Sequence, residues 1–396
     1  MDLFTQFGIP EPTPFSGALK VLVAESHNEI RLILSHHLTK LGFVVHRTER
    51  SGKVALAELL NDPAHITVAG DDLPGVAGLE LLRELRENPK AQRGAFVLLT
   101  KALQKNEAML AIEAGVDDFM VRPIALTDLM PKIRTAYANF VNPKSPERVY
   151  EFAKSKLRTD DLNGAKAVYE ALSLSNPKAA RPYVGLARVA LLSNQVDVAL
   201  KQVNFAVERN AMYVHAHALK AEILVKMNKV AEATEAFSTA IKISPLNITR
   251  YEQCCDFLLK NKLINETISI LEIGLTAGLH DPFIAERIGY CYFENKDYPK
   301  AQKYLRQAAR TDPENMGFAN SLAICCRDAG LLDESVEIYN TILKRENDNH
   351  LVLFNKALVL ILQNKKDEAG KILKRCLKIA PEFEKAKAKL GEIGIS

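Results

Sequence analysis

The segment ITVAGDDLPG, residues 66–75, places two aspartates directly behind an apolar run that is typical of a buried strand. Glu25 and Ser26 follow a similar run, KVLVA, and Thr100 ends a third, AFVLLT. Two aspartates behind a buried strand are what the rim of an acidic phosphorylation site would carry. These residue types therefore suggest phosphoryl chemistry at one edge of a sheet, and the question is which residue would accept the phosphoryl group.

The elements that position these residues alternate between short apolar runs and helix-like stretches from Leu19 to about Phe140. The strand candidates are KVLVA (20–24), FVVHR (43–47), HITVA (65–69), AFVLLT (95–100) and DFMVR (118–122). Strands that alternate with helices over this length predict an α/β fold, a doubly wound parallel sheet with helices on both faces. Ligand chemistry in such a sheet lies at the carboxyl ends of the strands.

Residues 19–140 resemble the receiver domain of two-component response regulators, the CheY-like family, whose sheet is flavodoxin-like. The resemblance implies an acidic pair after strand one that binds Mg²⁺, and an aspartate after strand three, four positions before a proline, that accepts phosphate. It also implies a Ser or Thr after strand four, an aromatic residue in strand five and a Lys-Pro pair behind it. The residues at these positions are Glu25 and Ser26, Gly70 before Pro74, Thr100, Phe119, and Arg122 before Pro123.

Several of these positions depart from the family pattern. Gly70 has no side chain to phosphorylate, Ser26 removes one carboxylate, and the planar guanidinium of Arg122 is not equivalent to a lysine ammonium. We therefore predict a phosphorylation-defective receiver that is not an enzyme and uses no metal or other cofactor. The alternative is a response regulator phosphorylated at Asp71. That requires a register shift, which would turn the Asp71 side chain to the opposite side unless a bulge compensates. Without phosphorylation, we expect Asp71 and Asp72 to be solvated loop carboxylates, with Asp72 capping the helix that starts near Val76.

The second half of the chain contains only helical patterns, and they repeat every 34 residues. One position of each repeat is small: Ala165, Ala199, Ala233, Thr267, Ala301, Ser335 and Ala369. A second small residue stands twelve positions earlier in every repeat, from Ala153 to Ala357. Small side chains let paired helices approach closely, and prolines such as Pro177 end the second helix. The pattern resembles the tetratricopeptide (TPR) repeat and implies an all-α superhelical solenoid of seven repeats over 146–382, with a capping helix over 383–396.

Composition limits the remaining possibilities. A chain of 396 residues predicts two or more domains, and a net charge of +4 gives no reason to expect a nucleic-acid partner. No apolar run reaches the length of a membrane span. The segment 1–18 lacks the basic start of a signal peptide, so we predict a disordered leader and a cytoplasmic location, with a short linker over 141–145.

The two resemblances together predict a bacterial signalling adaptor that binds proteins or peptides. The family's docking face, made by helix four, strand five and helix five, corresponds to Leu103–Ala114, Asp118–Val121 and Leu126–Phe140, with Met109, Phe119 and Met130 as candidates. The first helix of each TPR repeat lines a groove in this family. The groove candidates are Arg188, Lys226, Phe283, Tyr290, Phe293, Asn320 and Arg327, among which the three aromatic residues are the best anchors.

The last repeat is apolar on nearly all sides, in LVLFNKALVLILQ (351–363). The apolar positions that would face the groove are Leu351, Phe354, Leu358, Ile361 and Leu362. An amphipathic helix leaves one face polar. Each of these apolar side chains that stays exposed to water would forgo about 1.5–3 kcal/mol of the free energy that burial provides. Two explanations remain open: self-association or a partner covers this helix, or the curvature of the array buries it.

Overall fold

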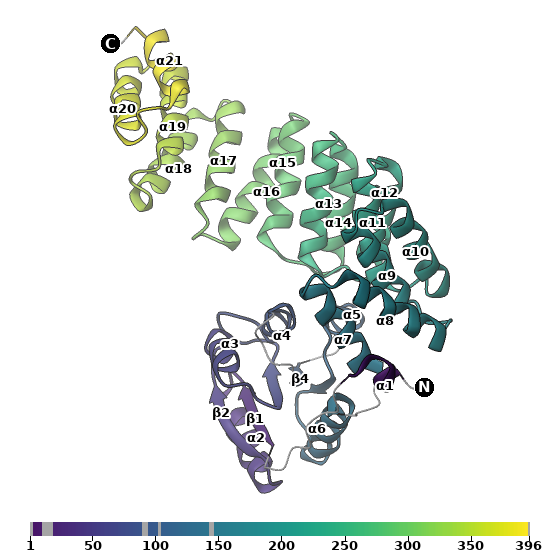
Figure 1. Cartoon of the computed structure of the whole chain (residues 1–396). Helices are drawn as coiled ribbons and strands as arrows, with labels where there is room; N and C mark the ends of the chain where they lie inside the picture. Colours follow the sequence, from purple (N-terminus) through teal and green to yellow (C-terminus); the bar gives the residue numbers. More distant parts are fainter. Residues whose placement is uncertain (1–2, 10–18, 89–93, 102–103, 142–145, 395–396) are drawn as a thin grey trace. The chain divides into compact units, whose positions relative to one another are not determined.

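The computed structural model describes residues 3–9, 19–88, 94–101, 104–141 and 146–394 (Figure 1). Its contacts divide the chain into two compact units, Met1–Leu246 and Asn247–Ser396. The first unit contains a parallel sheet followed by helices, and the described part of the second unit is helical. The predicted combination of an α/β fold and an all-α helical array is confirmed. The predicted linker, 141–145, lies outside the described residues except for Val141.

The sheet has five parallel strands in the order β2-β1-β3-β4-β5. Their bounds are β1 (Lys20–Ala24), β2 (Val44–Glu49), β3 (Ile66–Gly70), β4 (Ala95–Thr100) and β5 (Asp118–Val121). Strands β3 and β4 are buried throughout, which is why their sequences are nearly continuous apolar runs. This strand order is the flavodoxin-like one, and it places the carboxyl ends of β1 and β3 side by side at the switch point.

Helices cover both faces of this sheet, as the alternation of strands and helices predicts. They are α2 (Asn28–Lys40), α3 (Gly52–Asn61), α4 (Gly78–Glu87), α5 (Lys105–Ala114) and α6 (Leu126–Val141). One core contains Val21, Leu34 and Leu129, and the core on the other face contains Leu22 and Leu81. Because successive side chains of a strand point to opposite faces, neighbouring residues of β1 enter different cores.

The helices that follow form seven pairs of similar length. They are α7 (Pro146–Arg158) with α8 (Leu162–Ser175), α9 (Arg181–Leu192) with α10 (Val196–Arg209), α11 (Val214–Lys226) with α12 (Val230–Ile243), α13 (Ile248–Lys260) with α14 (Ile264–Thr276), α15 (Pro282–Glu294) with α16 (Tyr298–Thr311), α17 (Met316–Asp328) with α18 (Leu332–Arg345), and α19 (His350–Leu362) with α20 (Lys366–Ile379). None of the helices in the described part of the chain has the length and apolar character that crossing a membrane requires.

The 34-residue period appears in both packing and backbone geometry. All seven small residues predicted at the helix contacts, from Ala165 to Ala369, are fully buried. The hydroxyl of Ser335 donates to the Ala323 carbonyl oxygen across the pair, so this replacement of alanine is accommodated by a hydrogen bond. The turn inside each pair contains one residue with positive φ: Asp160, Asn194, Asn228, Lys262, Lys296, Gly330 and Asn364. Asn and Gly adopt this left-handed conformation most readily, which is why they recur there.

The prediction of a disordered leader over 1–18 is wrong for residues 3–9. Helix α1 (Leu3–Phe7) is followed by Ile9, which is buried. Its apolar side chains, with Phe4 and Phe7 three positions apart, join the core of the first repeat beside Tyr150. The end of a helical array leaves one apolar face without a neighbouring repeat, and this segment covers part of it. The remainder of the predicted leader lies outside the described residues.

The apolar helix α19 is covered in part by neighbouring segments of its own chain. The ring of Phe354 packs edge-on against Phe383, at 5.1 Å between centroids, just before α21 (Glu384–Glu392). Ile361 packs against the same core, and Leu358 is half-buried. Leu351 and Leu362 are 53% and 56% exposed. The structure therefore leaves two of the five predicted residues available for self-association.

Candidate functional site

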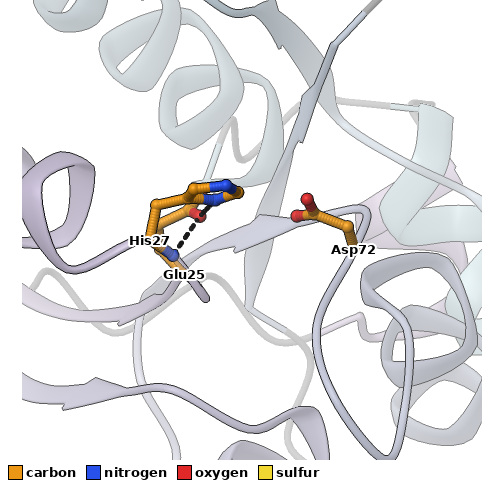
Figure 2. A group of neighbouring side chains, drawn as sticks. All are labelled: Glu25, His27 and Asp72. Atoms are coloured by element: carbon orange, nitrogen blue, oxygen red, sulfur yellow. Dashed lines mark hydrogen bonds and ion pairs between the residues drawn. The ribbon is translucent and has the colours of Figure 1, made fainter.

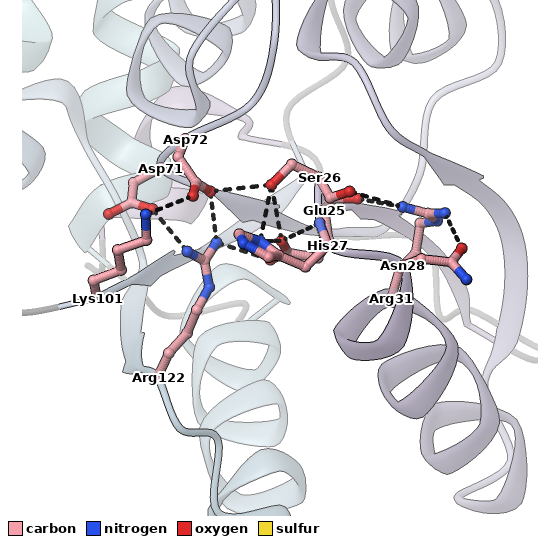
Figure 3. Close-up of polar contacts among 9 residues, drawn as sticks. All are labelled: Glu25, Ser26, His27, Asn28, Arg31, Asp71, Asp72, Lys101 and Arg122. Carbon is pink, nitrogen blue, oxygen red and sulfur yellow. Dashed lines mark hydrogen bonds and ion pairs between the residues drawn. The ribbon is translucent and has the colours of Figure 1, made fainter.

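The carboxyl ends of the sheet bring together a cluster of charged side chains from distant parts of the sequence (Figure 3). Glu25 directly follows β1, Asp71 and Asp72 follow β3, Lys101 follows β4, and Arg122 follows β5. The parallel register places these strand ends at one edge of the sheet. The cluster therefore stands where the alternating strands predict ligand chemistry, and it contains three carboxylates and two cationic side chains.

Arg122 is the centre of this cluster. Its Nη2 donates to Glu25 Oε2 at 2.8 Å and to Asp72 Oδ1 at 3.0 Å, and its Nη1 donates to Asp71 Oδ1 at 3.3 Å. The Glu25 side chain is fully buried and that of Arg122 is 8% exposed, so this pair is removed from water. A guanidinium has several donors in a fixed plane and can satisfy separate carboxylates at once, which a lysine ammonium does less well.

Gly70 is the residue that makes room for the guanidinium. A Cβ atom at position 70 would lie 2.7 Å from Arg122 Nη2 and 3.1 Å from Glu25 Oε2. Real Cβ atoms do not approach nitrogen this closely, so any side chain at Gly70 would have to displace Arg122. The glycine at position 70 and the arginine after β5 are thus two parts of one arrangement.

Asp72 links this buried pair to the surface. Its Oδ1 accepts from Arg122, and its Oδ2 lies 3.1 Å from Lys101 Nζ. Burial alone would raise the pKa of the Asp72 carboxyl, but the hydrogen bonds and charges of Arg122 and Lys101 lower it to about 2. For Arg122, burial opposes the charged form, yet Asp72, Glu25 and Asp71 raise its pKa. Asp72 is therefore a carboxylate at neutral pH.

A second group of contacts involves Glu25 and the loop after β1 (Figure 3). Glu25 Oε1 accepts from the His27 backbone N–H at 2.9 Å and lies 3.0 Å from His27 Nδ1 (Figure 2). The hydroxyl of Ser26 donates to Asp72 Oδ1 at 3.4 Å. Arg31 donates to the Glu25 backbone carbonyl oxygen at 2.6 Å and fixes the loop after β1. Glu25 is thereby held between a guanidinium and an imidazole.

Most residues predicted for the degenerate pocket are in it. Glu25, Ser26, Gly70, Asp71 and Arg122 lie in the cluster. Thr100 is buried at the end of β4, and Phe119 is half-buried in β5, where it packs against the core.

Two expectations for the loop after β3 are wrong. The Asp71 side chain does not turn away from the pocket but reaches Arg122, whose guanidinium holds its carboxylate, although the Asp71 N–H still donates to the Leu99 carbonyl oxygen of β4. Asp72 does not cap α4, whose N-cap residue is Ala77, because its carboxylate is held by two cations instead.

Three contributors were missed by sequence reasoning, namely His27, Lys101 and the pocket role of Asp72. Each stands within two positions of a residue that was considered, on the loop directly behind a strand. Their position at the strand ends was the available signal. The family's motif does not identify them, because none of the three residues occupies a motif position.

The family implies Mg²⁺ at this place, and the residues present do not fit it. Mg²⁺ prefers oxygen ligands in a regular octahedron. Here Gly70 contributes no carboxylate, and Ser26 stands where the family has an acid. The guanidinium of Arg122 already binds the carboxylates of Glu25 and Asp72. The positive charge that this pocket needs is already supplied by the chain itself.

The predicted TPR groove residues are scattered over helices of both units. In the first unit, Arg188 on α9 is paired with Glu222 on α11, with 2.8 Å to each carboxylate oxygen, and Lys226 is exposed. In the second unit, Asn320 accepts from Asn355, and Arg327 pairs with Asp328. Arg188 and Arg327 therefore already have anionic partners within the chain.

The three aromatic groove candidates differ in exposure. Phe283 is half-buried, with the Arg287 guanidinium 5.1 Å from its ring centroid. Phe293 is half-buried as well and packs against Tyr298, with 6.0 Å between ring centroids. Tyr290 is 36% exposed. Of the three, Tyr290 presents the most surface to a ligand.

Comparison with known proteins identifies both parts of the chain. Residues 21–134 match the model of the response regulator receiver domain. Models of the tetratricopeptide repeat match residues 150–203, 184–248, 292–353 and 351–383. The chain therefore carries a response regulator receiver domain followed by TPR repeats, as both resemblances implied.

Individual relatives cover only parts of the chain. The phosphate regulon transcriptional regulatory protein PhoB of Rhizobium meliloti is 30% identical over 117 residues, which are 29% of this chain and 50% of PhoB. The probable chemotaxis protein CheY of Rhizobium etli is 24% identical over 30% of this chain and 92% of its own length. The chain thus spans about half the length of PhoB. A TPR protein structure from Cytophaga hutchinsonii, at 16% identity and a TM-score of 0.50, covers 61% of this chain and 99% of that one, and shows the fold of the array.

Proposed function

We propose that this protein is a non-catalytic bacterial signalling adaptor in the cytoplasm. Its receiver domain works without phosphorylation, and its TPR repeats bind protein segments. The observation that carries the proposal is the contact of Arg122 with Glu25 and Asp72 in the space that a side chain at Gly70 would require. An acyl phosphate needs a carboxylate at this place and a cation to balance its charge. In this pocket the cationic side chains of Arg122 and Lys101 already pair with the carboxylates that are present.

Protein partners have two candidate surfaces in this proposal. One is the set of TPR groove residues, Arg188, Lys226, Phe283, Tyr290, Phe293, Asn320 and Arg327. The other is the receiver face made by α5, β5 and α6, on which Met109 is half-buried and Met130 packs against the core. Position 103, the predicted start of this face, lies outside the described residues. Arg122 stands between β5 and α6, so its ion pairs tie this face to the pocket. A homodimer through Leu351 and Leu362 belongs to the same proposal.

A second candidate function has one supporting observation. The Asp71 carboxylate is 32% exposed and reaches into the pocket, 3.3 Å from Arg122 Nη1. A response regulator phosphorylated at Asp71, with the TPR array as its output, would use this side chain as the acceptor. The ion pair with Arg122 uses Oδ1 of Asp71, which leaves the other carboxylate oxygen to attack a phosphoryl donor.

Phosphoryl transfer from acetyl phosphate separates the two functions. We expect intact mass spectrometry of the protein, incubated with acetyl phosphate and Mg²⁺, to show no added phosphoryl group. The triple variant Ser26→Asp, Gly70→Asp, Arg122→Lys is the matched positive control, because it rebuilds the acidic pair, the acceptor and the lysine of the family. We expect this variant to become phosphorylated.

A phosphoryl group on the wild-type protein would contradict the adaptor proposal. Its loss in Asp71→Asn, but not in Asp72→Asn, would establish Asp71 as the acceptor and the chain as a working response regulator. Because both aspartates are partly exposed at the pocket edge, neither single substitution is expected to unfold the domain.

A further inference from the structure

The first helices of the last four repeats, α13, α15, α17 and α19, follow one another in the second unit (Figure 1). Side chains on one face join each of these helices to the next. Asp256 Oδ1 on α13 lies 3.9 Å from Arg287 Nη2 on α15. Ser321 on α17 donates to Glu286 on α15 at 3.2 Å, and the amide contact of Asn320 described above joins α17 to α19. The faces that these contacts connect form one continuous surface, the α13–α19 surface.

The α13 part of this surface is acidic. Glu252 and Asp256 stand one helical turn apart and are both exposed, with 75% of the Asp256 side chain open to solvent. Glu252 forms no ion pair within the described part of the chain. Lys260, the cation of this face, is the last residue of the helix. The two carboxylates near the middle of α13 are therefore open to a cationic ligand.

Helix α15 continues the negative charge. Glu286 lies 3.7 Å from Arg287 Nε, and Glu294, two turns further along the same face, is exposed. Tyr290 stands between them, and burial together with the Glu294 charge raises the pKa of its phenol. A neutral aromatic ring beside carboxylates suits a Lys or Arg side chain. Helices α13 and α15 together present four carboxylates and two cations, in a chain whose net charge is +4.

The α19 end of the surface is apolar. Leu351 and Leu362 are both more than half exposed, and Leu358 between them is half-buried. An open pocket beside this end is lined by Tyr298, Arg327, Asp328, Gly330, Leu332 and Leu362. The rim of this pocket carries an ion pair whose charges compensate each other, Arg327 with Asp328. Exposed leucines beside such a pocket favour an apolar side chain as ligand.

Two half-buried amides lie between the acidic and the apolar ends. Asn355 Nδ2 donates to Asn320 Oδ1 at 3.3 Å. This contact leaves Asn320 Nδ2 and Asn355 Oδ1 without a hydrogen-bond partner among the described residues. Each peptide unit of a ligand offers one N–H donor and one C=O acceptor, which are the groups that these two atoms require. The middle of the surface therefore suits the backbone of a bound segment.

We propose that the α13–α19 surface binds a protein segment with Lys or Arg at one end and Leu, Val or Phe at the other. The basic end lies on α13 and α15, and the apolar end lies on α19. Neighbouring helices pack about 8–10 Å apart, so an extended segment of about eight residues spans the three steps from α13 to α19. Burial of the leucines supplies affinity, and the carboxylates fix the orientation. This inference rests on the proposed binding of protein segments by the TPR repeats, and it adds the chemistry of those segments.

Fluorescence anisotropy of labelled peptides, titrated with the full-length protein, tests this chemistry. The bipolar peptide joins Lys-Arg-Lys to Leu-Val-Phe through a Ser-Asn-Ser-Gly spacer, and a second version carries the two blocks in reverse order. One control peptide has Glu-Asp-Glu as its charged block, and another has Ser-Asn-Ser in place of the apolar block. We expect one of the two bipolar peptides to bind at least about tenfold more tightly than either control.

Glu252→Lys combined with Asp256→Lys should weaken binding of the bipolar peptide by about tenfold or more and remove most of its salt dependence. Both side chains are exposed, so this variant keeps the fold. The matched control makes the same change on the partner helix α14 of that repeat, as Glu266→Lys with Glu272→Lys. Both of these glutamates are exposed, and their replacement should leave peptide affinity unchanged.

Leu351→Ser combined with Leu362→Ser should also weaken binding of the bipolar peptide by about tenfold. Leu174→Ser is its control, since Leu174 is 80% exposed on α8 in the first unit. If the leucine pair instead lowered the mass of the protein in sedimentation without changing peptide affinity, these leucines would belong to a homodimer and the apolar half of the inference would be wrong.

Two further outcomes separate this inference from the proposed function. Control peptides that bind as tightly as the bipolar ones, or a bipolar peptide that is insensitive to Glu252→Lys with Asp256→Lys, would overturn the inference and leave segment binding by the array in place. No binding of any peptide would overturn both the inference and the role of the array. The phosphorylation state of the receiver is measured independently, by the acetyl phosphate experiment.

Discussion

Replacing Arg122 by methionine should lower the stability of the receiver domain by about 3–5 kcal/mol. The substitution leaves Glu25 fully buried beside two further carboxylates, with Lys101 near the surface as the cation that remains. Removing one member of a buried ion pair is costly because the other charge loses its compensation. Because the chain has more than one domain, a single unfolding transition does not report the stability of the receiver domain alone. Hydrogen exchange of the β1 and β3 amides measures the stability of that domain directly.

A double-mutant cycle makes this prediction specific to the ion pair. The Glu25→Gln, Arg122→Met double variant removes both charges and should recover about 2–3 kcal/mol relative to the sum of the single changes. Lys101→Met is the matched control, because Lys101 contacts Asp72 but its side chain is 67% exposed, so its loss should cost less than about 1 kcal/mol. Additive effects of Glu25→Gln and Arg122→Met would show that Arg122 does not compensate the buried charge.

Gly78→Ala is the second substitution with a large expected effect, about 3 kcal/mol of destabilisation of the receiver domain. A Cβ at position 78 would lie 2.1 Å from the Gly70 carbonyl oxygen, and backbone cannot yield as a flexible side chain does. Helix α4 would have to move away from β3, and with it the loop that carries Asp71 and Asp72. Hydrogen exchange of the β3 amides should therefore be faster in Gly78→Ala than in the wild-type protein.

The control for this prediction is Gly391→Ala in α21, where nothing lies within 4 Å of the added atom. Alanine favours a helix over glycine by about 1 kcal/mol at most, so this variant should be neutral or slightly stabilised. If Gly78→Ala behaved like Gly391→Ala, the close approach of α4 to Gly70 would not be a feature of the folded protein.

The sequence predicted the fold well because its signals are local and repeated. Strands β1 and β4 were predicted with their observed bounds, and the seven small residues that the 34-residue period identified, from Ala165 to Ala369, are all fully buried. The N-terminal segment was misjudged because Pro10, Pro12 and Pro14 suggest disorder, whereas the side chains of α1 pack into the core of the first repeat. Such contacts between distant segments have no local signature.

The candidate site was predicted in part for the same reason. The motif positions point to Glu25, Gly70 and Arg122, and each of these residues directly follows a strand or ends one. The sequence alone did not show that the guanidinium of Arg122 fills the space above Gly70, since that depends on the distance between β3 and β5 ends across the sheet. The roles of Asp72 and His27 likewise arise only when the loops after β1 and β3 are brought together.

The central claim is that the cation of this pocket is Arg122. A crystal structure of the receiver in the full-length protein, determined with excess Mg²⁺ and the phosphoryl mimic beryllofluoride, tests it most directly. We predict that the guanidinium remains within hydrogen-bond distance of Glu25 and Asp72, with no mimic attached to either aspartate after β3. A beryllofluoride group on Asp71 or Asp72, with Mg²⁺ between it and Glu25 and Arg122 displaced, would contradict the account.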